Sequence, residues 1–89
     1  MIPTKILIAE DEILIAREIE GILQDLSYEV VAIVHDGEAA IQKIAETQPD
    51  LVLMDIVMPG AKDGIDTANH IRKEFQIPVV YLTAHADTD

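Results

Sequence analysis

The chain is 89 residues long, which is enough for one small domain, and 49% of its residues are hydrophobic. This composition is typical of a globular protein and not of a disordered tail. The formal charge of −11 at pH 7 makes nucleic acid and anionic membranes poor partners, whereas metal cations and basic protein surfaces are better ones.

Several further classes are excluded by what the sequence lacks. It has no cysteine, so disulfides, thiolate metal sites and cysteine nucleophiles are ruled out. Its start, "MIPTKILIAEDE", lacks the basic region and long apolar run of a signal peptide. No apolar run approaches the roughly 20 residues that a membrane span needs. We therefore expect a cytoplasmic protein with no membrane partner.

Short apolar runs alternate with helical hydrophobic spacing along the whole chain. The predicted elements, in chain order, are strand 5–10, helix 11–28, strand 29–35, helix 36–48, strand 51–55, helix 64–75 and strand 77–83. This alternation predicts an α/β fold with a parallel sheet. The first, third and fourth strands are nearly continuous apolar runs, as expected for strands that are covered on both faces.

The first helix is predicted to be amphipathic. The residues of its apolar face are spaced 4, 3 and 4 apart: Ile15, Ile19, Ile22 and Leu26.

Acidic residues follow the strands at their carboxyl ends, where ligands bind in open parallel sheets. Glu10 and Asp11 follow the first strand, and Asp55 ends the third. If these two strands are neighbours, Asp11 and Asp55 face each other, and two carboxylates about 4 Å apart repel by about 4 kcal/mol at an effective dielectric of about 20. A raised pKa or a bound cation would offset this repulsion. With oxygen ligands only, Mg²⁺ is the cation that fits best.

Each of these residues also has a purely structural explanation. Asp11 and Glu12 could cap the first helix and Asp36 the second, Asp55 could be a turn residue before Pro59, and Thr83 could be an ordinary strand residue. The three histidines are separated along the chain, and we expect them to be surface or packing residues. The acids are informative together, because independent caps have no reason to share one edge of a sheet.

Four segments, in order and at matching spacing, resemble the receiver domain of two-component response regulators. They are "KILIAEDE", "LVLMDIVMPG", the "DG" that opens the next helix, and "IPVVYLTA". The resemblance covers residues 1–89 and implies a flavodoxin-like doubly wound parallel sheet. It also implies a phosphoryl-accepting signalling module, with a histidine kinase or a histidine phosphotransfer protein as partner, and not an enzyme with an external product.

The resemblance assigns roles to individual residues. It makes Asp55 the phosphoacceptor, and Glu10 and Asp11 the acids that hold Mg²⁺ together with Asp55 and the backbone carbonyl of Val57. The hydroxyl of Thr83 and the backbone amide of Ala84 would bind the phosphoryl group and act as the switch. No residue of this sequence matches the lysine that family members carry at the end of their fifth strand.

Only four strands and three helices are predicted, whereas the family has five βα units. The fourth helix, the fifth strand and the fifth helix are absent, so we expect a receiver domain that is incomplete at its C-terminus. The sequence is either part of a longer protein or a true fragment. For a fragment, we expect homo-oligomers through the edge of the fourth strand or through the sheet face that the missing helix would cover.

Three other functions are known for sheets of similar topology or remain compatible with the fold. A Mg²⁺-dependent phosphohydrolase or nuclease would carry a second acid two residues after Asp55, where this chain has Val57. A flavin-binding domain would carry a phosphate loop after the first strand, where "AEDEILI" offers acids. A pseudo-receiver, which is an interaction scaffold that does not signal by phosphorylation, stays open because the lysine is absent.

Overall fold

The computed structural model describes residues 2–57 and 64–82 and contains one four-stranded parallel sheet in the order β2-β1-β3-β4. The elements are β1 (Lys5–Ala9), α1 (Ile13–Asp25), β2 (Glu29–Val34), α2 (Gly37–Thr47), β3 (Leu51–Asp55), α3 (Gly64–Phe75) and β4 (Val79–Leu82). The predicted α/β class, the seven elements and their order are confirmed.

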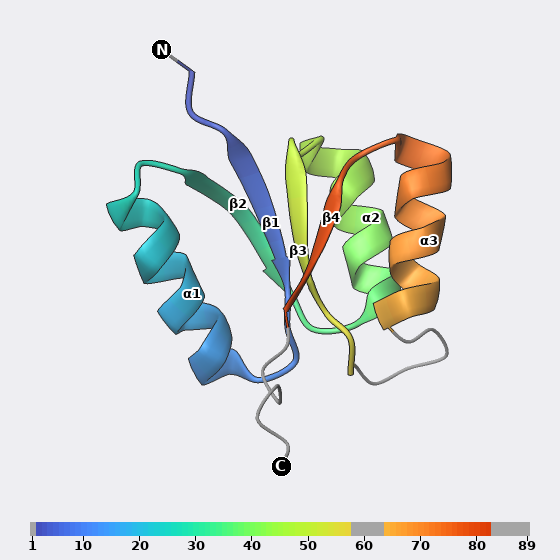
Figure 1. Cartoon of the computed structure of the whole chain (residues 1–89), viewed down its shortest axis with the longest axis horizontal. Helices are drawn as coiled ribbons and strands as arrows, with labels where there is room; N and C mark the ends of the chain where they lie inside the picture. Colours follow the sequence, from blue (N-terminus) through green and yellow to red (C-terminus); the bar gives the residue numbers. More distant parts are fainter. Residues whose placement is uncertain (1, 58–63, 83–89) are drawn as a thin grey trace.

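The sheet separates two unequal helical layers, with α1 on one face and α2 and α3 on the other (Figure 1). The main core lies between the sheet and the α2–α3 layer. Its buried side chains come from three strands, β1, β2 and β3, and from the two helices of this layer: Leu7, Ala9, Val34, Ala40, Ile44, Val52, Met54 and Ile71. Burial of these aliphatic groups is the main source of stability in so small a chain.

The boundaries of α2 follow from local chemistry that is readable in the sequence, whereas Glu12 at the start of α1 makes no side-chain cap hydrogen bond. Asp36 caps α2, and its Oδ1 accepts a hydrogen bond of 2.7 Å from the backbone N–H of Ala39. Gln48 ends the same helix in the left-handed conformation, with φ of 50°. Pro49 follows and cannot continue a helix, so the chain turns directly into β3.

The adjacency of β1 and β3 brings the two acidic strand ends together. Ala9 pairs with Met54 at the end of the β1–β3 register, so the next residues along the two strands are Glu10 and Asp55. Parallel strands in register point equivalent side chains to the same face. The expected neighbourhood of the first and third strands is therefore confirmed.

The apolar face of α1 is only partly buried. Ile22 is 56% exposed and Leu26 63% exposed, although Ala16 on the same helix is fully buried. The reason is that α1 contacts β1 and β2 but neither β3 nor β4. Among the described residues, no helix covers β3 and β4 on the face of the sheet where α1 lies, and Val80 of β4 is 48% exposed.

No helix in the described part of the chain combines the length and the apolar character that a bilayer crossing requires.

The core prediction compares two isoleucines of α3. Ile71 is fully buried and Ile65 is 47% exposed. We expect Ile71→Ala to lower the free energy of unfolding by about 2–5 kcal/mol, because it removes buried methylene groups and leaves a cavity. The matched variant Ile65→Ala should cost less than about 1 kcal/mol. Urea denaturation measures both values, and equal losses would contradict this assignment of the core.

A second prediction concerns the apolar surface over β3 and β4. We expect these 89 residues to form concentration-dependent oligomers in sedimentation experiments, because β4 is an edge strand of the described sheet and an edge beside an apolar face favours association. Val80→Lys should shift the population toward monomer by placing a charge on that surface. A wild-type chain that sediments as a monomer at high concentration would refute the prediction.

Candidate functional site

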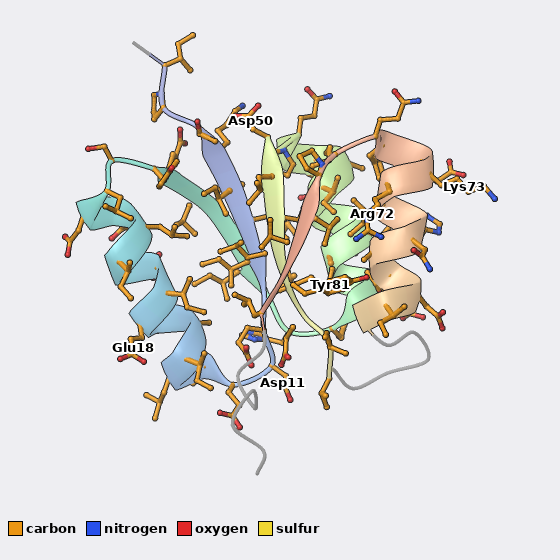
Figure 2. All side chains as sticks on the ribbon, viewed as in Figure 1. Asp11, Glu18, Asp50, Arg72, Lys73 and Tyr81 are labelled. Atoms are coloured by element: carbon orange, nitrogen blue, oxygen red, sulfur yellow. The ribbon has the colours of Figure 1, made fainter. Side chains whose placement is uncertain are left out.

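Three carboxylates meet at the carboxyl end of the sheet. One oxygen from each of Glu10, Asp11 and Asp55 lies within 4.8 Å of the other two. Figure 2 shows Asp11 just beyond the end of β1, at the opposite end of the sheet from Asp50, which precedes β3. The three acids that the sequence placed at one edge are therefore gathered into one cluster.

The three acids differ in their exposure to solvent. Glu10 is 1% exposed and Asp55 is 4% exposed, whereas Asp11 lies on the surface. The difference follows from position, since Glu10 and Asp55 continue paired strands and Asp11 begins the turn into α1. The cluster thus combines two buried acids, Glu10 and Asp55, with one acid on the surface, Asp11.

Glu10 is held firmly through its backbone and through one of its side-chain oxygens. Its N–H donates to the carbonyl of Val34 at 2.9 Å, and its own carbonyl lies 2.9 Å from Nδ1 of His35. Its Oε2 accepts a hydrogen bond of 3.0 Å from the N–H of Glu12. Its Oε1 is buried and has no hydrogen-bond partner among the described residues. A buried carboxylate oxygen without a partner is costly and calls for a proton or a cation.

Burial raises the pKa of the Glu10 carboxyl from 4.5 to about 7. The hydrogen bond from the Glu12 N–H lowers this pKa, while the nearby carboxyl groups of Asp55 and Asp11 raise it further. Near neutral pH the protein alone therefore keeps part of the Glu10 population protonated. A cation bound at the cluster would favour the ionised form instead.

The residues present fit a hard divalent cation. All the candidate side-chain ligands are carboxylate oxygens, which Mg²⁺ prefers, and the exposed side of the cluster at Asp11 leaves room for the waters that this ion retains. The buried Oε1 of Glu10, which has no partner in the described part of the chain, is the group that such an ion would stabilise most.

The turn after β3 brings a backbone group to Asp55. The N–H of Val57 donates to Oδ1 of Asp55 at 3.3 Å, while the Val57 side chain is 63% exposed. Any role of Val57 at the cluster therefore belongs to its backbone. The two predicted phosphoryl-binding residues, Thr83 and Ala84, lie outside the described residues.

Three neighbours of the cluster were not predicted from the sequence. The Glu12 amide and the His35 ring contact Glu10. His35 is exposed, which agrees with the expectation that it is a surface or packing residue. Gly64 lies against the backbone of Asp55. The only sequence signal for Gly64 was its place in the "DG" that opens α3, because close approach between distant segments leaves no mark in hydrophobic periodicity.

The raised pKa of Glu10 predicts a specific pH dependence in metal-free buffer. Because the folded state binds the proton more tightly, the stabilisation is complete below pH 4.5 and is lost as the pH rises through 7. The variant Glu10→Gln keeps the shape and cannot ionise. We expect its free energy of unfolding to rise relative to wild type as the pH rises from 4.5 to 8, by up to about 3 kcal/mol.

Urea denaturation at several pH values, without divalent cations, measures this difference. Glu18→Gln on the exposed part of α1 is the control, and its difference from wild type should change little with pH. A Glu10→Gln difference that is independent of pH would contradict the assignment.

The chain matches one known protein family over most of its length. Residues 6–89 match the response regulator receiver domain. Over 88 residues the chain is 41% identical to the transcriptional regulatory protein PdtaR of Mycobacterium tuberculosis, covering 99% of this chain and 42% of that protein. The chain thus spans less than half the length of this relative.

Solved structures with a similar level of sequence identity share the fold of this chain. The N-terminal domain of a response regulator/sensory box/GGDEF 3-domain protein from Carboxydothermus hydrogenoformans is 44% identical, with a TM-score of 0.85, covering 94% of this chain and 67% of that one. The anti-anti-sigma factor PhyR of Bartonella quintana, solved with the anti-sigma factor NepR, is 36% identical, with a TM-score of 0.82, covering 90% and 33%. The chain belongs to the response regulator receiver domain family, whose members are signalling modules of two-component systems and not enzymes with an external substrate.

Proposed function

We propose that Asp55 accepts a phosphoryl group from a phosphohistidine, at a site where Glu10, Asp11, Asp55 and the Val57 carbonyl hold Mg²⁺. The observation that supports this most strongly is the cluster of three acid oxygens within 4.8 Å of one another, one of them from the enclosed Glu10. Such a cluster repels anions when it is empty of cations and favours phosphate once a cation offsets its charge.

The position of Asp55 suits a nucleophile. It ends a buried strand that is paired on both sides, by β1 and by β4, so its backbone is rigidly mounted. The Val57 N–H donates to Oδ1 and orients the carboxylate. In the proposed transfer, an oxygen of Asp55 attacks the phosphorus, the P–N bond of the phosphohistidine breaks, and an acyl phosphate forms.

Phosphoryl transfer depends on positioning and on neutralisation of charge more than on covalent help from the protein. Bound Mg²⁺ would supply the positive charge that the carboxylates and the incoming phosphoryl group share. Glu10 and Asp11 would hold the ion, and the proposed contacts of Thr83 and Ala84 with the phosphoryl oxygens would change the structure once phosphate is bound. The change would then be read by a downstream output.

The proposed donor is a histidine kinase or a histidine phosphotransfer protein, which would meet the chain in the cytoplasm. The net charge of −11 supports a partner with a basic or apolar docking surface. A second candidate function is that of a pseudo-receiver, which binds a partner without phosphorylation. It is favoured by the absence of any residue that matches the family's lysine, and by the relative PhyR, whose structure includes the anti-sigma factor NepR.

Phosphorylation by a small phosphodonor tests the proposal. Incubation with Mg²⁺ and acetyl phosphate should add about 80 Da to the chain in mass spectrometry, as expected for one phosphoryl group. Asp55→Asn should abolish this gain because the amide is not a nucleophile. Asp50→Asn, at the opposite end of the same strand, is the matched control and should be modified as wild type (Figure 2).

Removal of Mg²⁺ with a chelator should also abolish the gain. The same measurement in the presence of Mg²⁺ is made on a protein that includes any following domains. If its wild-type Asp55 gains no phosphoryl group there, the result favours the pseudo-receiver.

A further inference from the structure

The first residue of α3 lies directly against the backbone that carries the phosphoacceptor. Gly64 begins this helix, and its N–H donates to the carbonyl of Ile56 at 3.0 Å. This hydrogen bond joins the start of α3 to the residue that immediately follows Asp55. The start of α3 and the end of β3 are therefore one packed unit.

The space beside Gly64 has no room for a side chain. A Cβ atom at this position would lie 2.2 Å from the carbonyl oxygen of Asp55, 2.6 Å from Cα of Ile56 and 2.7 Å from the carbonyl oxygen of Ile56. Real Cβ contacts are essentially never shorter than 3.0 Å. All three neighbours are backbone atoms, so no side-chain rotation can relieve the overlap. The backbone of Asp55 and Ile56 would have to move.

The requirement at Gly64 concerns space and not backbone conformation. Its φ does not lie in the left-handed region, so an alanine could adopt the same backbone angles. Gly21 in α1 provides the contrast, because a Cβ there meets no atom within 4 Å. Helix propensity alone would favour alanine at both positions. Only at Gly64 does the tertiary structure exclude it.

We propose that Gly64 is a positioning residue of the acidic centre, which allows the start of α3 to clamp the Asp55–Val57 turn in the geometry that metal binding and phosphoryl transfer need. This inference rests on the proposed function of Asp55. The clamp acts on the carbonyl of Asp55 and on Ile56, which lie between the phosphoacceptor carboxylate and the Val57 amide that donates to it.

The size of the displacement explains why the clamp would matter. Relief of the overlap requires the Asp55 carbonyl contact to open from 2.2 Å to beyond 3.0 Å. Functional groups need to be held within about 0.5 Å of their productive positions, and Mg²⁺ demands near-ideal octahedral geometry. A misplacement of about 1 Å can cost about 100-fold in rate.

The test compares Gly64→Ala with Gly21→Ala in the whole chain. The Mg²⁺ dissociation constant, the rate of phosphorylation by acetyl phosphate and the metal-free amide chemical shift of Val57 are measured, all at a temperature where thermal unfolding shows each variant to be folded. For Gly64→Ala we expect Mg²⁺ affinity to fall at least about tenfold, phosphorylation to slow about 100-fold and the Val57 amide to shift. For Gly21→Ala all three readouts should match wild type.

The outcomes separate this inference from the proposed function. If wild type binds Mg²⁺ and is phosphorylated, and Gly64→Ala matches it in affinity and rate, the positioning role is refuted and the proposed function stands. If wild type does neither, the proposed function fails, and an unmoved Val57 amide in Gly64→Ala then refutes the clamp as well.

A second variant separates a general loss of stability from a loss of positioning at the site. If Gly64→Ala does not fold, the same measurements are made on the double variant Gly21→Ala/Gly64→Ala in a stabilising osmolyte, because alanine at position 21 favours α1. A double variant that stays unfolded there overturns the proposal, since the requirement for Gly64 would then belong to folding and not to the site.

Discussion

Repulsion between carboxylates at the ends of β1 and β3 is the constraint on which the functional end of this protein depends. Glu10 and Asp55 are nearly excluded from solvent, and Asp11 stands beside them with one oxygen of each within 4.8 Å of the others. A folded chain tolerates such a cluster only when a proton or a cation reduces its charge. The raised pKa of Glu10 shows the first solution, and Mg²⁺ would provide the second.

The rest of the fold holds these acids in place. The β1–β3 register sets Glu10 beside Asp55, and the pairing of Asp55 with Leu82 of β4 fixes the other side of the strand. The first residue of α3, Gly64, packs closely against the backbone of the same turn. The hydrophobic core between the sheet and α2–α3 therefore stabilises a geometry that electrostatics alone would disperse.

Much of this arrangement was predictable from the sequence, because it depends on short-range patterns. The apolar runs that end in Glu10 and Asp55 predicted both the strands and the acidic edge, and Asp36 predicted a helix cap. What could not be predicted depends on packing between distant segments. Hydrophobic spacing marks Ile22 as apolar without showing whether another element covers it, and nothing local marks Gly64 as a point of close approach.

The central claim is that Glu10, Asp11 and Asp55 share one hard cation, and paramagnetic NMR tests it most directly. Mn²⁺ accepts the same oxygen ligands as Mg²⁺ and broadens the amide signals nearest to it. At substoichiometric Mn²⁺, we expect the amides of Glu10, Asp11 and Val57 to broaden first, and excess Mg²⁺ to restore them. Broadening that begins elsewhere, for example around Glu18 and Asp25 on α1, or that spreads evenly over the acidic surface, would contradict the account.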